Sequence, residues 1–242
     1  MLLKKKMINK FIDCKDKLEF HFQNILKVCD NRFEKGCGSY LFDGQNYSYF
    51  EEYKDKQILL FEKVQNKTNV LEIGTYMGHS LLIMLLSNPN LKITCIDIND
   101  EFSFPATEYL KKNFPSAKIN FIHNNSLNVI NKIEEKFDFI HIDGAHKNKI
   151  ITKEFNYCKK LGLNDDLEFI FDDSYNCRSL ISNILSCYNI AEHKSVGYGY
   201  YTSDFIKLKY INPILKNIFF NFLNSKDYFF HKLKKLMKGN KI

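Results

Sequence analysis

The chain has 242 residues, a length that favours one α/β domain with extensions over two full domains. Hydrophobic residues make up 45% of the sequence and charged residues 26%, which supplies enough apolar material for a sizeable core and excludes general disorder. The formal net charge is +7, but residues 212–242 alone hold seven lysines and one acid, so the remainder is close to neutral. The composition therefore does not indicate a nucleic-acid-binding surface.

The seven cysteines are scattered and never spaced as Cys-x-x-Cys, which is typical of reduced thiols and argues against a zinc site. The first residues carry lysines without the apolar stretch of a secretion signal, and no run reaches the ~18 apolar residues of a membrane span. We therefore expect a soluble, cytoplasmic protein.

Short apolar runs alternate with helical stretches between about Thr68 and Tyr210, the pattern of a parallel sheet covered by helices on both faces. The expected strands are Val70–Ile73, Ile93–Ile96, Ile119–Ile122, Phe137–Ile142 and Phe169–Phe171. The expected helices are Phe11–Cys29, Tyr49–Lys63, Ser80–Leu86, Ala106–Asn113, Leu127–Glu135, Ile150–Leu161 and Arg178–Tyr188. Two extended stretches in Ser195–Tyr210, around Tyr201–Asp204, predict a terminal antiparallel hairpin. The predicted fold is a Rossmann-like, doubly wound α/β sheet.

Residues 69–80, NVLEIGTYMGHS, have the form of a strand ending in an acid, followed by a glycine turn that opens a helix. Gly74 and Gly78 allow close approach of a cofactor, and the N–H groups at the helix start can bind a carboxylate or phosphate. The spacing is G-x-x-x-G, which differs from the G-x-G-x-x-G of dinucleotide-binding folds and weakens a nicotinamide interpretation.

Asp97 ends the second expected strand, 23 residues after Gly74, where an acid in such folds binds the ribose hydroxyls. Together with Glu72 and the glycine turn, Asp97 indicates a cofactor that contains a nucleoside. The structural alternative is a tight turn with solvated acids. Asn124, Asn125 and Ser126 end the third strand and can either read an adenine edge or cap the following helix.

Three carboxylates follow the next two expected strands: Asp143 after one, and Asp172 with Asp173 after the other. Because the carboxyl ends of neighbouring parallel strands converge, these side chains can meet in one crevice. Clustered carboxylates repel each other unless a cation joins them, and oxygen ligands suit Mg²⁺. The alternative is that they cap helices or bond loop amides.

His146 lies three residues beyond Asp143, where an imidazole can take a proton from a substrate hydroxyl. The alternative is a loop histidine bonded to the backbone. His141 shares strand parity with Asp143, but on a strand buried on both faces we expect a hydrogen-bonded core histidine.

The chain resembles class I S-adenosylmethionine-dependent methyltransferases. The residues that carry this resemblance are Glu72–Ser80, Ile142–His146 and Asp172–Asp173. The similarity is to the metal-dependent catechol and caffeoyl-CoA O-methyltransferase type, and to macrocin-type sugar O-methyltransferases. It covers about Thr68 to Arg178 and implies a seven-stranded sheet with a reversed last strand.

This resemblance implies a role for each motif residue. Glu72 and the turn Gly74–Gly78, with Tyr76, would hold the methionine part of the cofactor, and Ser80 its carboxylate. Asp97 would bind the ribose, and Asn125 and Ser126 would lie beside the adenine. The divalent cation would sit on Asp143, Asp172 and Asp173, although the third ligand is Asn in the catechol and caffeoyl-CoA enzymes. His146, with Asp143, would stand at the catalytic position, where the catechol enzyme places a lysine.

The implied activity is O-methylation of a sugar, glycan or small-molecule hydroxyl, with a divalent ion, Mg²⁺, binding the acceptor and lowering its pKa. Residues 143–146, Asp-Gly-Ala-His, differ from the Asn/Asp-Pro-Pro-aromatic motif of amino-directed nucleic-acid methyltransferases, so no nucleic-acid substrate is expected. Two alternatives remain open: a nicotinamide oxidoreductase, which would leave the three carboxylates unexplained, and a non-catalytic protein with a methyltransferase fold.

The sequence divides into an N-terminal helical cap (1–55), a methyltransferase domain (56–211) and a C-terminal basic amphipathic helix (212–242). That helix is expected to pack on the body or on a second copy in a homodimer, and the alternative is contact with an anionic membrane surface. The aromatic residues Tyr40, Phe42 and Tyr198–Tyr201 can line an acceptor pocket or serve packing.

Overall fold

The computed structural model describes residues 10–33, 54–145, 147–163, 167–172, 188–196 and 200–207. His146, Asp173, Tyr40, Phe42 and the tail 212–242 lie outside these residues, as does all but the last residue of the helix expected over Arg178–Tyr188. The predictions made for them are therefore not tested by the structure.

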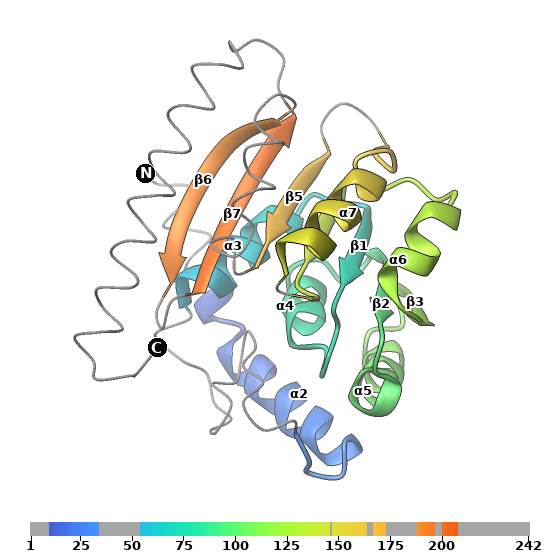
Figure 1. Ribbon diagram of the computed structural model, residues 1–242. Coiled ribbons are helices and arrows are strands. Elements are labelled where there is room, and N and C mark those ends of the chain that lie inside the picture. Colours follow the sequence, from blue (N-terminus) through green and yellow to red (C-terminus); the bar gives the residue numbers. More distant parts are fainter. Residues whose placement is uncertain are drawn as a thin grey trace, which may run out of the picture.

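The core of the molecule is one seven-stranded sheet with the strand order β3-β2-β1-β4-β5-β7-β6 (Figure 1). The first five strands are parallel, and β7 runs antiparallel to both of its neighbours, β5 and β6. The direction of winding reverses between β1 and β4, which makes the sheet doubly wound, as predicted. The strands are β1 (Asn69–Ile73), β2 (Lys92–Asp97), β3 (Lys118–His123), β4 (Phe139–Ile142), β5 (Glu168–Phe171), β6 (Tyr188–Val196) and β7 (Tyr200–Lys207).

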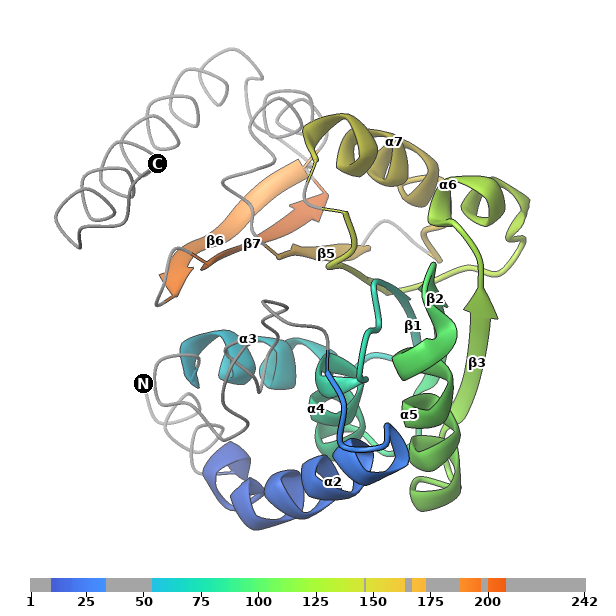
Figure 2. The same cartoon turned by 60° about the horizontal axis from the view of Figure 1, so that its bottom comes forward.

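Helices cover the sheet on both faces (Figure 2). One face carries α3 (Lys54–Val64), α4 (His79–Ser87) and α5 (Asp100–Asn113), with α2 (Lys15–Val28) outside them. The other face carries α6 (Ser126–Val129), the 3₁₀ turn η2 (Ile130–Lys132) and α7 (Asn148–Cys158).

Alternate residues of the strands bury side chains on opposite faces of the sheet, which explains their nearly continuous apolar character. Val70, Ile93 and Phe139 belong to the core beneath α3, α4 and α5. Leu71 and Ile140 belong to the second core, which they share with residues of α7. No side chain among these five is measurably exposed, so burial on both faces was correctly predicted from the sequence.

Several helix boundaries differ from the sequence-based expectation, most of all those of α5 and α6. Helix α5 begins at Asp100 rather than Ala106, because the Asn99 side chain caps it by accepting a hydrogen bond from the Glu101 N–H. The helix expected over Leu127–Glu135 is instead short: α6 and η2 together end at Lys132.

Helix α2 packs into the main core. Leu18, Phe22 and Ile25 are buried in it, and the Phe22 ring lies 5.0 Å from that of His79 in α4. Helix α3 begins at Lys54, just before the expected start of the central domain, and its buried face joins the same core. The described helices α2 and α3 thus share one core, and the division into cap and domain remains a prediction.

The hairpin at the end of the described chain has its turn earlier than expected. Strand β6 ends at Val196 and β7 begins at Tyr200, with glycines 197 and 199 between them in the sequence. Tyr201–Asp204, expected at the turn, lie inside β7, where Ser203 pairs with Phe171 and Asp204 with Ile170 of β5. The polar residues of this strand are also common in turns, which explains the incorrect position predicted for the turn.

Cys14, Cys29, Cys95 and Cys158, the cysteines within the described residues, are free thiols. None of the helices in this part of the chain combines the length and apolar character that a membrane span requires.

Candidate functional site

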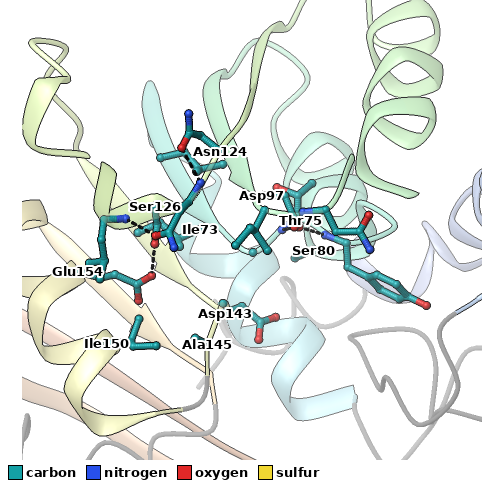
Figure 3. Close-up of a pocket in the computed structure, with 18 of the residues that line it drawn as sticks. Ile73, Thr75, Ser80, Asp97, Asn124, Ser126, Asp143, Ala145, Ile150 and Glu154 are labelled. Atoms are coloured by element: carbon teal, nitrogen blue, oxygen red, sulfur yellow. Dashed lines mark hydrogen bonds between the residues drawn. The ribbon is translucent and has the colours of Figure 1, made fainter. Parts of the chain in front are cut away.

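A pocket of about 410 Å³ opens at the carboxyl ends of the strands, where the winding of the sheet reverses. Its wall comes mainly from the loops that follow β1, β2, β3 and β4, together with the first turns of α4 and α7. Figure 3 shows Asp97 and Thr75 on one side of the pocket and Ser126 and Glu154 on the other, with Asp143 in the lower part. The volume and position are those expected of a ligand site in a doubly wound fold.

Gly74 joins the loop after β1 to the loop after β4. It has a φ of +87°, and a Cβ at this position would lie 2.2 Å from the Asp143 carbonyl oxygen. The Asp143 N–H also donates to the Ile73 carbonyl at 2.8 Å, so the two loops are in direct backbone contact. Gly74 lines the pocket, but the close approach that requires glycine is to the protein's own backbone.

Gly78 lies where α4 packs against α5. It has a φ of +68° and is not among the residues that line the pocket. A Cβ at Gly78 would lie 3.1 Å from the Leu110 side chain, so the residue permits α4 to pack against α5. The predicted approach of a cofactor to Gly78 remains a prediction.

Asp97 orders the turn after β1 from the neighbouring strand. Its Oδ2 accepts hydrogen bonds from the N–H groups of Thr75 at 2.8 Å and Tyr76 at 2.7 Å. Its Oδ1 accepts from the Asn99 N–H at 2.9 Å. Tyr76 has a φ of +46°, an unfavourable conformation for this residue, and the bond to Asp97 helps to hold it. Asp97 is half-buried and lines the pocket, where its carboxylate can still accept from a ligand hydroxyl.

Glu72 lies behind the pocket instead of lining it. Its side chain is fully buried, and its Oε1 accepts a hydrogen bond from the Ser80 hydroxyl at 2.6 Å. His141 Nδ1 lies 3.2 Å from the same oxygen, so His141 is the buried, hydrogen-bonded core residue that the sequence predicted. Glu72 thus orients Ser80, which does line the pocket.

The opposite wall contains a buried acid that the sequence analysis missed. Glu154 of α7 is 1% exposed, and its Oε1 accepts a hydrogen bond from the Ser126 hydroxyl at 2.5 Å. Its Oε2 has no hydrogen-bond partner within the part of the chain that the structure describes. Burial raises the pKa of Glu154, and the Ser126 hydrogen bond opposes the shift only in part. The signal available in the sequence was an acid within the apolar stripe formed by Ile151, Phe155 and Cys158.

The neighbouring predicted residue, Asn125, lines the pocket and also caps α6, its Oδ1 accepting from the Leu127 N–H at 3.0 Å. Both interpretations of this asparagine are therefore compatible with its position. His79, the first residue of α4, is a further pocket residue that the sequence analysis did not single out. Burial lowers the pKa of His79 to about 3, so its imidazole is neutral at physiological pH.

The structure brings together Asp143 and Asp172, two of the three predicted carboxylates. Asp143 lines the pocket, whereas Asp172 is 5% exposed and lies behind it. Asp172 forms a short ion pair with Lys56, a residue of α3 that is itself only 2% exposed. Burial alone would raise the pKa of Asp172, but the Lys56 ammonium and a hydrogen-bonding interaction with Asp143 lower it instead.

These contacts test whether the described residues fit a divalent cation. Asp172 Oδ1 has no hydrogen-bond partner in the described chain, which is a feature that a bound ion would satisfy. Its Oδ2, however, is held by Lys56, and an ammonium group there repels a second cation at the same carboxylate. No group of three or more metal-ligating side chains occurs among the described residues, which do not include Asp173. We conclude that the described residues do not fit a divalent ion.

Residues 51–163 match the family described as O-methyltransferase. A caffeoyl-CoA O-methyltransferase of Arabidopsis thaliana is 35% identical over 106 residues, which is 41% of this chain and 39% of that protein. The chain spans about 37–42% of the length of the curated relatives it matches first.

Two solved structures share the fold. A methyltransferase of Podospora anserina with bound SAH has a TM-score of 0.59 at 13% identity, covering 78% of this chain and 88% of that one. An O-methyltransferase of Bacillus cereus in complex with SAH has a TM-score of 0.57 at 18% identity, covering 78% of this chain and 90% of that one. These matches confirm the predicted resemblance to the O-methyltransferase family and the predicted α/β methyltransferase fold.

Proposed function

We propose that this protein transfers the methyl group of S-adenosylmethionine to a hydroxyl oxygen of a small molecule. The observation that carries the proposal is the pocket at the reversal point of the sheet, with Asp97 on one wall and Ser126 with Glu154 on the other. The match of residues 51–163 to the O-methyltransferase family supports the reaction class.

The ribose, adenine and methionine parts of the cofactor each have suitable hydrogen-bonding partners in the pocket. The carboxylate of Asp97 would accept hydrogen bonds from the ribose hydroxyls. Asn125, Ser126 and Glu154 would face the adenine, and the unpartnered Glu154 Oε2 is an acceptor suited to the exocyclic amine. The turn at Gly74–Tyr76 and the hydroxyl of Ser80, which Glu72 holds in place, would bind the methionine part.

Hydrogen-bonding side chains surround the predicted adenine position: Asn125, Ser126 and Glu154. Adenine carries no charge, so hydrogen bonds rather than ion pairs must recognise it. Burial raises the pKa of Glu154, and its Oε2 has no hydrogen-bond partner among the described residues, so this carboxyl group is available to hydrogen-bond the adenine. The site is therefore better matched to a nucleoside than to a phosphate group.

In the reaction, the acceptor oxygen forms a bond to the methyl carbon while the carbon–sulfur bond breaks and S-adenosylhomocysteine is released. The acceptor loses its hydroxyl proton in the process. Since the methyl sulfonium is already reactive, the protein must mainly hold the acceptor in line and accept that proton. Asp143 lines the pocket and would face the acceptor, and His146 remains the base predicted from the sequence.

Phenol and sugar hydroxyls are both candidate acceptors. The relative named for caffeoyl-CoA favours testing phenols first. The sugar or glycan hydroxyl expected from the sequence also remains a prediction, as does the cytoplasmic location.

The test is incubation of the protein with S-adenosylmethionine labelled in the methyl group, together with panels of phenols, nucleotide sugars and glycans. Mass spectrometry of the products should find an added methyl on oxygen. Binding of S-adenosylmethionine is measured separately by calorimetry, with NAD and NADP as competitors. Methylation confined to nitrogen or to RNA, or tighter binding of a nicotinamide cofactor, would contradict the proposal.

A further inference from the structure

We propose that the ammonium group of Lys56 takes the place of a divalent cation at the acceptor end of the site, so that Asp143 and Asp172 are held together without metal. Lys56 would then be a positioning residue that acts through Asp172 on Asp143. The positioning role of Lys56 rests on the proposed function. The replacement of a metal ion by its ammonium group does not, because metal binding can be measured without substrate.

The first support is the burial of Lys56. Its side chain is 2% exposed, and lysine is almost never buried to this degree unless it is paired. Its partner is the Asp172 carboxylate, 5% exposed, which lies 116 residues away in the sequence. The pair therefore joins the first turn of α3 to the end of β5 through the interior of the molecule.

The second support is the position of the two aspartates at neighbouring strand ends. The Asp172 N–H donates to the Ile142 carbonyl at 3.0 Å, and Asp143 is the next residue after Ile142. The Asp143 N–H in turn donates to Ile73 at the end of β1. The backbone thus fixes both carboxylates at the same edge of the sheet, whether or not a cation lies between them.

Two carboxyl groups held this way either share a proton or are stabilised by a neighbouring positive charge. A divalent ion would supply two charges and would need several oxygen ligands with space for water. Lys56 supplies one compact charge and three hydrogen-bond donors from within the fold. Because Lys56 already occupies Asp172 Oδ2, a metal ion would find only Oδ1 of this carboxylate open, beside a buried ammonium group that repels it.

The position of Asp143 gives the pair its functional consequence. Asp143 lines the pocket and interacts with Asp172, whereas Asp172 and Lys56 do not line it. Lys56 can therefore act on an acceptor only by fixing the charge and orientation of the aspartates. That is the role of a positioning residue.

The experiment titrates Mn²⁺ into the full-length protein and follows free Mn²⁺ by electron paramagnetic resonance. We expect no binding to the wild type up to 1 mM Mn²⁺, on the order of the weakest affinities of protein metal sites. Lys56→Ala should gain binding at least tenfold tighter, because Asp143 and Asp172 Oδ2 become available alongside the unpartnered Oδ1. Lys56→Arg, which keeps the charge, should remain without binding.

A matched control comes from the same helix. Lys63 of α3 is partly buried and pairs with Glu168 at 3.4 Å, away from the pocket. Lys63→Ala should therefore leave Mn²⁺ binding unchanged. A general loosening of α3 would increase binding in both alanine variants and would overturn the assignment to Lys56.

Two further readouts keep the proposal testable if Lys56→Ala is poorly folded. Mn²⁺ should raise the melting temperature of Lys56→Ala or of Lys56→Met and should leave that of the wild type unchanged. Methyl transfer by the wild type should persist in excess chelator. Tight Mn²⁺ binding by the wild type, or loss of its activity on chelation with recovery on adding Mn²⁺, would overturn the proposal and would support the metal predicted from the sequence.

These outcomes separate the inference from the proposed function. If S-adenosylmethionine does not bind in calorimetry but Lys56→Ala gains Mn²⁺ binding, the charge replacement stands and the methyl-transfer proposal fails. If methyl transfer is found and the wild type binds Mn²⁺, the methyl-transfer proposal stands and the charge replacement fails.

Discussion

Two buried carboxyl groups, Glu154 in the pocket wall and Asp172 behind the pocket, meet opposite surroundings. Glu154 receives a hydrogen bond from the Ser126 hydroxyl, and burial raises its pKa. Asp172 is equally enclosed, but the neighbouring Lys56 ammonium lowers its pKa. Burial therefore does not by itself set the direction in which the pKa of an acid shifts, because a neighbouring cation can reverse it.

This contrast matches what each end is proposed to bind. The end at Ser126 and Glu154 would face an uncharged adenine, for which neutral hydrogen-bonding groups suffice. The end at Asp143 and Asp172 would face a hydroxyl that must lose a proton, for which fixed charges matter. The following predictions test the contrast, beginning with the largest expected effect.

Removing the cation at the Asp172 end should cost the most stability. Lys56→Met leaves Asp172 buried without its partner, and breaking a buried pair in this way costs about 3–5 kcal/mol. The free energy of unfolding, measured by urea denaturation at pH 7, should fall by that amount. The double variant Lys56→Met/Asp172→Asn removes the charge as well and should recover most of the loss. A loss that is as large in Lys63→Met would show that the effect is not specific to the buried pair.

Disrupting the contact between the loops after β1 and β4 should lower the stability of the protein. In Gly74→Ala the added Cβ would meet the Asp143 carbonyl oxygen at 2.2 Å with φ at +87°, and we expect a loss of at least about 3 kcal/mol. Gly78→Ala meets only the flexible Leu110 side chain at 3.1 Å and should lose about 1–2 kcal/mol. Thermal unfolding of the two variants compares them directly, and equal losses would contradict the proposed role of Gly74.

A third carboxylate, Asp97, has neither a hydroxyl donor like that of Glu154 nor a cation like that of Asp172, and instead accepts hydrogen bonds from backbone N–H groups. Asp97→Ala should weaken S-adenosylmethionine binding by about 1.5–3 kcal/mol, the usual loss for a hydrogen bond to a charged group. Calorimetry measures the change. Asp100→Ala, an exposed acid beyond the pocket wall, serves as the control and should bind like the wild type. Equal affinities of the wild type and Asp97→Ala would remove Asp97 from the cofactor site.

The smallest effect is expected at Glu154, and it depends on pH. Because the folded protein raises this pKa above its ordinary value of 4.5, the folded state binds the proton more tightly than the unfolded chain. The contribution of Glu154 to stability is therefore favourable at low pH and declines as the pH rises from 4.5 to the raised pKa. Glu154→Gln should be more stable than the wild type at pH 7.5, and the difference should vanish near pH 4.5.

Denaturation curves at both pH values test this, with Glu134→Gln as an exposed control that should show no such trend. Glu154→Gln should also change the affinity for S-adenosylmethionine if the carboxyl group faces the adenine. A stability difference that grows toward acid pH would contradict the assigned direction of the pKa shift.

The sequence by itself determined the strands and their common edge. Continuous apolar runs such as Val70–Ile73 can be satisfied only by burial on both sides, and polar residues at their carboxyl ends then share one crevice. Asp97, Ser126 and Asp143 could be placed at the pocket for this reason. Local sequence patterns predicted the structure less well at Tyr201–Asp204. These residues are typical of a turn, but pairing with β5 places them in a strand.

Only the tertiary structure decided which partner each acid meets. Gly78 faces Leu110 of α5, Glu72 orients Ser80 from behind the pocket, and Glu154 reaches Ser126 from α7. Lys56 meets Asp172 across 116 residues of sequence, and nothing in the spacing of either residue indicates the contact. The charge of a buried group depends on partners within a few ångströms, and packing rather than local sequence brings those partners together.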